Sequence, residues 1–290
     1  MTQSADHNDE HDQGLLYDLS TMRHPSRLHV DRRNALRLVG VAGAGLVLVA
    51  CGKDGKRASS TTSTPEFTPT TAAGSATTVS ASSAPAVPEE TAGPFPGDGS
   101  NGPNVLNQSG IVRSDIRSSF GSSSGTADGV PLTVKLTVIN TKTKAPYTGA
   151  AIYLWHCDAE GGYSLYSPGV TKQNYLRGVQ AADSNGLITF KTTYPAAYPG
   201  RWPHMHFEVF PSLAEATKSG ATLVMSQIAL VESTNNEVYA SDPIYSGSVQ
   251  NMRRTSLSND GVFRDGAELE TPTMTGDLAS GLTLNFNVGV

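Results

Sequence analysis

Two stretches of the chain alternate apolar and polar residues with a period of two, as a β-strand with one buried face does. They are residues 132–138 and 282–288, and shorter strand candidates lie at residues 151–157, 187–192, 205–210 and 223–231. Gly, Pro, Asn and Asp interrupt the chain between them, which is typical of turns. A single short helix is expected at residues 212–218. Many short strands without long helical segments predict an all-β fold, a single β-sandwich.

A low-complexity segment limits where this sandwich begins. Residues 58–90 consist almost entirely of Ser, Thr, Ala and Pro. Such a composition cannot bury enough apolar surface to offset the entropy of ordering the chain. We therefore expect a disordered linker at residues 51–90 and the β-sandwich domain at residues 91–290.

The first 50 residues predict an N-terminal extension followed by a signal peptide. Arg32 and Arg33 precede an uncharged run at residues 38–50, which is shorter than the ~20 apolar residues of a membrane helix. This order of basic, apolar and small residues is typical of a signal peptide, and the arginine pair indicates twin-arginine export. A buried helix is the alternative, but the Gly and Ala residues at 42–45 make a poor core helix. Residues 48–51 resemble a bacterial lipobox, which predicts an exported lipoprotein anchored to the membrane through Cys51, in the periplasm or at the cell surface.

Charge and cysteine content exclude several classes of protein. The net charge is −5, and no Lys or Arg occurs between Arg57 and Arg113, so nucleic-acid binding is not expected. The chain has two cysteines, Cys51 and Cys157, so it has no disulfide framework. The sequence gives no basis for predicting the oligomeric state.

A His-x-His pattern is the first candidate for chemistry. On a strand, His204 and His206 share a face with Glu208, and imidazoles about 6.8 Å apart along that face can reach one metal ion. A hydrogen-bonded surface pair is the alternative. Glu208 would complete a triad of two histidines and a carboxylate, but it lies about 13 Å from His204 along a strand. We therefore expect Glu208 to be exposed or to support a ligand. The opposite, core-facing side would carry Met205, Phe207 and Val209.

Two tyrosines near the histidine strand are candidate metal ligands. Tyr163 ends a glycine-containing turn, and Tyr198 lies in a proline-rich loop that leads into the strand. A phenolate oxygen is hard and anionic, which favours a trivalent iron, and such a metal would lower the usual tyrosine pKa of ~10 enough for ligation at neutral pH. Tyr166 and Tyr194 are interpreted as pocket wall or core.

The neighbours His156 and Cys157 are adjacent on a predicted strand and therefore face opposite ways. They cannot form a nucleophile–base pair. We expect His156 to be a hydrogen-bonded strand histidine and Cys157 to be a small buried residue.

Five segments carry motifs in an order that resembles one enzyme family. They are residues 90–96, 155–163 (Trp-x-x-Asp-Ala-x-Gly-x-Tyr), 183–190, 195–199 (Pro-x-x-Tyr-Pro) and 201–207 (Arg-Trp-Pro-His-Met-His-Phe). Together they resemble the metal-binding core of the intradiol ring-cleavage dioxygenases of the catechol and protocatechuate type, over about residues 88–232. Trp202 and Pro203 depart from the family's Pro-Ala, and the stretch from Tyr198 to His204 is shorter than in the protocatechuate enzymes.

The resemblance implies a non-haem Fe(III) enzyme that degrades aromatic compounds. Its metal ligands would be Tyr163, Tyr198, His204 and His206. A catechol-type substrate would bind the iron through both oxygens and displace Tyr198, which accepts a substrate proton. Arg201 would stabilise negative charge on the ring, and Gln227 would lie beside the substrate. Insertion of O2 between the two hydroxyl-bearing carbons would give a muconate-type diacid.

Two other classes of function remain open from the residues alone. One is a tethered extracellular β-sandwich binding module without a metal. The other is a zinc or copper protein that uses His204, His206 and a third ligand such as His156. Tyrosinate bound to Fe(III) predicts a red-brown protein that bleaches on reduction, whereas the alternatives do not.

Overall fold

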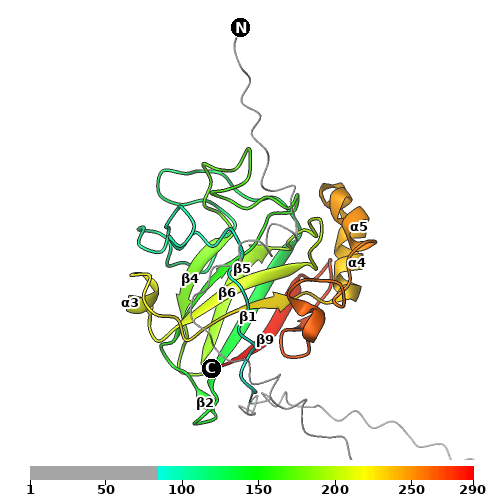
Figure 1. Ribbon diagram of the computed structural model, residues 1–290. Helices are drawn as coiled ribbons and strands as arrows, with labels where there is room; N and C mark the ends of the chain where they lie inside the picture. Colours follow the sequence, from blue (N-terminus) through cyan, green and yellow to red (C-terminus); the bar gives the residue numbers. More distant parts are fainter. Residues whose placement is uncertain (1–83) are drawn as a thin grey trace, which may run out of the picture. The chain divides into compact units, whose positions relative to one another are not determined.

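The computed structural model describes residues 84–290, and this part of the chain forms two β-sheets packed face to face (Figure 1). The first sheet has the order β2-β1-β9-β8, and β5 also pairs with β1. Its strands are β1 (Pro131–Asn140), β2 (Ala145–Pro146), β5 (Leu187–Thr193), β8 (Thr273–Thr275) and β9 (Leu282–Gly289). The second sheet has the order β4-β3-β6-β7. Its strands are β3 (Ala151–Trp155), β4 (Arg177–Ala181), β6 (His204–Phe210) and β7 (Val224–Ala229).

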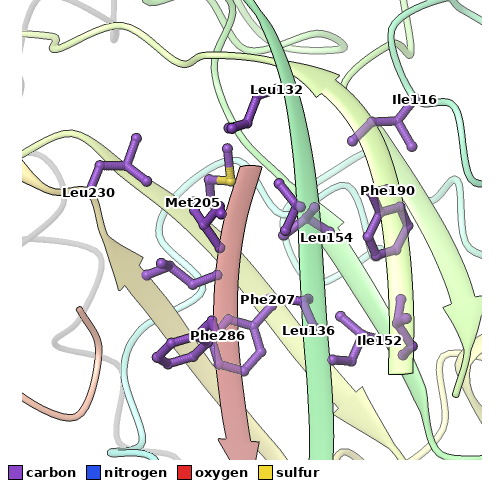
Figure 2. Close-up of a cluster of buried hydrophobic side chains, with 14 of the residues drawn as sticks. Ile116, Leu132, Leu136, Ile152, Leu154, Phe190, Met205, Phe207, Leu230 and Phe286 are labelled. Atoms are coloured by element: carbon purple, nitrogen blue, oxygen red, sulfur yellow. The ribbon is translucent and has the colours of Figure 1, made fainter. Parts of the chain in front are cut away.

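The core lies between the two sheets and follows from the period-two pattern. Strands β1 and β9 pair in parallel, with Leu132 opposite Leu282, so their alternating apolar residues share one face. Figure 2 shows Leu136 of β1 and Phe286 of β9 among apolar side chains that include Phe207 of β6. Burial of each such side chain contributes about 1.5–3 kcal/mol. The predicted sandwich of mostly strands in two sheets is therefore confirmed.

Residues 84–290 contain few helices. The expected helix at 212–218 is α3 (Leu213–Ala216), which begins where the Ser212 hydroxyl accepts a hydrogen bond from the backbone N–H of Glu215. Two helices that the sequence did not predict, α4 (Glu232–Ser241) and α5 (Ser246–Met252), contact each other at one side of the sandwich (Figure 1). A short 3-10 turn, η2 (Pro243–Tyr245), connects α4 to α5, and another, η3 (Phe263–Asp265), follows α5. No helix within residues 84–290 is long and apolar enough to span a bilayer.

The sandwich begins earlier than the predicted boundary at residue 91. Ala86 forms a bridge with Gly289 of β9, Val87 is buried, and the backbone N–H of Glu90 donates to the carbonyl of Met225 on β7 (2.8 Å). Backbone hydrogen bonds hold this short segment, and amino-acid composition cannot predict them. The predicted signal peptide (residues 1–50), the lipobox cysteine and most of the predicted linker lie outside the described residues.

Candidate metal centre

Strand β6 presents the two histidines as its alternation predicts. Met205, Phe207 and Val209 belong to the sandwich core, so His204 and His206 face the other side of the sheet. The Nε2 atoms of the two histidines are 3.1 Å apart, and both side chains are almost fully buried. The alternative that the two histidines form a hydrogen-bonded pair on the surface is therefore excluded.

A tight turn holds Tyr163 against this pair. Asp158 organises the turn: its Oδ1 accepts hydrogen bonds from the backbone N–H groups of Glu160 (3.1 Å) and Gly162 (2.7 Å). The Tyr175 hydroxyl donates to the other carboxylate oxygen (3.1 Å). The turn places the Tyr163 hydroxyl 3.5 Å from His204 Nε2.

A second loop brings Tyr198 to the same histidine, with its hydroxyl 3.1 Å from His204 Nε2. Helix α5 fixes this loop from outside. The backbone N–H of Ala197 donates to the Ser248 hydroxyl (3.0 Å), and the Asn251 side chain donates to the Ala197 carbonyl (2.8 Å). The tail of the chain, from residue 241 onward, therefore supports a candidate ligand through α5.

The spacing of these atoms fits a shared metal ion. Ligands at about 2.1 Å from a metal and 90–110° apart lie about 3.0–3.4 Å from one another. Around His204 Nε2, the separations of 3.1 Å from Tyr198 and 3.1 Å from His206 fall in that range, and the 3.5 Å from Tyr163 lies just above it. The donor set is two imidazole nitrogens and two phenol oxygens, which suits a hard trivalent ion.

The protonation state of the histidines also suits ligation. His204 Nδ1 lies 2.6 Å from the Trp202 carbonyl, which only accepts, so Nδ1 carries the proton and Nε2 keeps its lone pair. Burial, with a further contribution from Arg201, lowers the His204 pKa well below its usual value. Burial and then the neighbouring His204 lower the pKa of His206 in the same direction. Both rings are therefore neutral at neutral pH, as metal binding requires.

His206 is wedged between an aromatic ring and the N-terminal segment. Its imidazole stacks on Trp155, with ring centroids 5.0 Å apart and planes 5° apart. Gly93 approaches from the segment before β1, and a Cβ at this position would lie 3.1 Å from His206 Cε1. The segment that resembles a family motif at residues 90–96 thus forms part of the site wall.

Arg201 and Gln227 lie together beside the histidine pair. Arg201 Nη2 donates to Gln227 Oε1 (2.7 Å), and Gln227 is the register partner of His206 across β6 and β7. Arg201 Nε also forms a buried ion pair with Asp260 (3.0 Å). Sequence reasoning missed Asp260, because it lies in a turn-rich stretch with no pattern that sets it apart.

Glu208 is not exposed, which was one of the two roles predicted for it. It is buried, and burial followed by the nearby Asp98 raises its pKa to about 8. Among residues 84–290, no group of three or more His, Cys, Asp or Glu side chains is arranged to hold a metal. A triad of two histidines and Glu208 is therefore not formed.

The remaining candidates lie outside the histidine–tyrosine cluster. His156 Nδ1 donates to the Cys157 carbonyl and Nε2 lies 2.7 Å from the Thr192 hydroxyl, so both ring nitrogens are engaged. Cys157 is buried. Tyr194 donates to Asn235 in the core. These contacts confirm that His156 is hydrogen-bonded and that Cys157 and Tyr194 are buried, although β3 ends at Trp155 and does not include His156. They also remove His156 as a third ligand of a zinc or copper site.

Two other aromatic residues are also accounted for. The hydroxyl of Tyr166 donates to the Asn101 carbonyl (2.8 Å), and its ring packs on Phe95, which also packs on Tyr163. Tyr166 is therefore part of the wall. The Trp202 indole N–H donates to the Leu230 carbonyl (2.7 Å), so the bulky departure from the family motif is accommodated in a buried cluster with Phe263.

Comparison with known proteins finds similarity to dioxygenases. The Dioxygenase family model (Dioxygenase_C) matches residues 101–229. Chlorocatechol 1,2-dioxygenase of Rhodococcus opacus is 40% identical over 53 residues, 18% of this chain and 21% of that protein. Catechol 1,2-dioxygenase of Pseudomonas sp. (strain EST1001) is 36% identical over 53 residues, 18% of this chain and 17% of that protein. The matched stretch thus spans about a fifth of each curated relative.

A solved structure extends the likeness to nearly the whole described domain. The intradiol ring-cleavage dioxygenase from Tetranychus urticae superposes with a TM-score of 0.56 at 25% identity, over 71% of this chain and 94% of that one. The two proteins share their fold. The chain is therefore similar in fold, and locally in sequence, to intradiol ring-cleavage dioxygenases.

Proposed function

We propose that the chain is an Fe(III)-dependent dioxygenase that cleaves a catechol-type ring between its two hydroxyl-bearing carbons. One observation carries the proposal: His206 Nε2 and the hydroxyl oxygens of Tyr163 and Tyr198 all lie 3.1–3.5 Å from His204 Nε2. Tyr163, Tyr198, His204 and His206 would hold the iron. Bound Fe(III) would withdraw electron density from a coordinated catecholate and so prepare the ring for reaction with O2. The names of both curated relatives support a catechol-type substrate.

The two tyrosines are suited to different tasks. Tyr163 is buried, with 2% of its surface exposed, whereas Tyr198 is only partly buried. The more accessible Tyr198 is thus the better candidate to leave the metal when substrate arrives and to accept a substrate proton. Tyr163 and the histidines would remain in place. One catechol and one O2 would give one muconate-type diacid, with no external reductant.

Arg201 would stabilise negative charge that develops on the substrate. The guanidinium is fully buried, and a fixed positive charge acts most strongly where water is excluded. Gln227 holds Nη2 of this guanidinium through its Oε1 and donates its own amide to the Thr91 carbonyl (2.9 Å). We therefore assign Gln227 to orienting Arg201 beside the substrate.

The proposal is tested by the colour, metal content and O2 uptake of the purified protein. We expect bound iron, a red-brown absorption that bleaches on reduction, and one O2 consumed per catechol. Tyr198→Phe should shift the absorption and slow turnover. Tyr194→Phe is the matched control, because its hydroxyl bonds Asn235 in the core. A colourless protein, or two variants with the same spectrum, would contradict the ligand assignment.

We also propose that the enzyme is exported and tethered to the membrane through a lipid on Cys51. The arginine pair, the short apolar run and the Leu-Val-Ala-Cys segment support this. Cys51→Ala should move the protein from the membrane fraction to the soluble fraction. The double variant Arg32→Lys/Arg33→Lys should keep the protein in the cytoplasm. Unchanged fractionation of both variants would refute the tether and the export route.

A further inference from the structure

Asp260 is buried at the edge of the candidate metal centre and holds four hydrogen-bond donors. Its Oδ2 accepts from Arg201 Nε (3.0 Å) and from the backbone N–H of Trp202 (2.6 Å). Its Oδ1 accepts from the backbone N–H groups of Val262 (2.8 Å) and Phe263 (3.2 Å). The side chains of Arg201 and Asp260 are both 0% exposed. Hydrogen bonds from its own turn therefore fix the carboxylate in addition to its contact with the arginine.

The Arg201 guanidinium is held from two sides. Asp260 binds Nε, and Gln227 binds Nη2 at 2.7 Å. Because the guanidinium is planar, bonds at two of its nitrogens set the orientation of the whole plane. Gln227 is the register partner of His206. The hydrogen-bonded series Asp260–Arg201–Gln227 therefore ends on β7, the strand next to the histidine strand.

The same carboxylate also positions an aromatic ring. Phe263, whose N–H Asp260 accepts, lies with its ring centroid 6.0 Å from Arg201 Cζ and 6.4 Å from the His204 ring. One residue of the tail thus orders both the cation of the site and an apolar side chain beside it. A buried guanidinium without a paired carboxylate would carry a large desolvation penalty.

We propose that Asp260 is a positioning residue, which fixes the plane of Arg201 so that its charge meets the negative charge that develops on the substrate. This inference rests on the proposed function. A donor that is already oriented stabilises a transition state without reorganising during the reaction. Loss of the orientation should therefore lower kcat more than it weakens substrate binding.

Asp260→Asn tests the role directly. The amide oxygen can keep accepting from the Val262 and Phe263 N–H groups, which places the NH2 group, a donor, against Arg201 Nε and the Trp202 N–H. We expect kcat for catechol to fall on the order of 10- to 100-fold, with KM within about threefold. Iron content, the tyrosinate absorption and the anaerobic affinity for catechol should stay near wild type. Asp242→Asn is the matched control, because Asp242 caps a turn through the Ile244 N–H (3.0 Å) away from Arg201, and it should leave kcat unchanged.

A double-mutant cycle separates positioning from general structural support. In an Arg201→Met background, Asp260→Asn should change kcat less than about twofold, since its partner is already gone. An equal loss in both backgrounds, or wild-type kcat in Asp260→Asn, would overturn the inference. Should Asp260→Asn fail to fold, Arg201→Lys decides: it keeps a charge beside Asp260 without a fixed plane, so wild-type kcat there would overturn the inference. An iron-free wild type that consumes no O2 would instead refute the proposed function, and this inference with it.

Discussion

Gly93 offers a perturbation whose effect on the site can be worked out from the structure. Its φ is +67°, a left-handed conformation that L-residues rarely adopt, and a Cβ there would lie 3.1 Å from His206 Cε1 and 3.7 Å from Nε2. Gly121 has the same φ of +67°, but a Cβ there would meet nothing within 4 Å. Substitution by Ala therefore imposes the same backbone strain at both positions and a steric contact at Gly93 only.

The expected magnitudes follow from this pair. The left-handed conformation should lower the free energy of unfolding of each Ala variant by about 1–2 kcal/mol, which shifts Tm by about 2–8 °C in a domain of this size. In Gly93→Ala the methyl must also push His206 by a few tenths of an ångström, and the stacked Trp155 ring restricts how the imidazole can tilt. Misplacement of a reacting group by 1 Å can cost ~100-fold in rate, so we expect about a tenfold loss of kcat/KM.

The assay compares O2 uptake, iron content and visible absorption for the two variants beside urea unfolding. Gly93→Ala should lose activity and alter the tyrosinate–iron absorption, while Gly121→Ala should match wild type in both. Wild-type activity in both variants would refute the argument that Gly93 is needed for close approach to His206. The same loss of activity in both variants would also refute it and would assign the loss to backbone strain alone.

Two further predictions concern the support of the site and the pH dependence of the fold. Ser248→Ala should remove the acceptor of the buried Ala197 N–H, which lowers the free energy of unfolding by about 1–3 kcal/mol. The same variant should broaden the Tyr198-dependent absorption. Ser246→Ala, at the start of α5, is the control for both the unfolding and the absorption measurements. Burial lowers the His156 pKa from 6.5 to about 4. Between these two pH values the unfolded chain binds a proton at His156 more readily than the folded chain does. The free energy of unfolding therefore falls as the pH drops from 6.5 towards 4, by up to ~3 kcal/mol. Urea unfolding at pH 7 and pH 5 should show a smaller loss in His156→Gln than in wild type, and equal losses would contradict the assignment.

The histidine strand could be predicted because its information is local. A period of two places His204 and His206 on one face and Phe207 on the other, whatever the strand packs against. The turn that carries Tyr163 is local as well, since Asp158 caps it within five residues of chain. The burial of Glu208 could not be predicted in this way, because it depends on the segment around Asp98, far away in sequence.

The missed elements have weak local signals for identifiable reasons. Helix α4 (Glu232–Ser241) contains Ser, Thr and two Asn, which are poor helix formers, and its N-terminus has no side-chain cap. Tertiary burial of Val238 and Tyr239 stabilises it instead. Strand β4 (Arg177–Ala181) contains Gly178 and the buried Arg177, so its sequence lacks the alternation of β1 and is specified by pairing with β3.

Asp260 marks the limit of local reasoning at the site itself. The resemblance implied that the positive charge of Arg201 lies beside the substrate. A charged side chain that is buried in protein is stabilised by a partner of opposite charge, here a carboxylate. That requirement can be stated from the sequence, but the identity of the partner cannot, because it lies 59 residues away in a stretch without periodicity. The pairing arises only because the tail folds back from α5 and places the 260–263 turn against β6 and β7. A tail that read as loop is thus what gives the arginine its orientation, and kinetics of the Asp260 and Arg201 variants would measure how much of the rate depends on it.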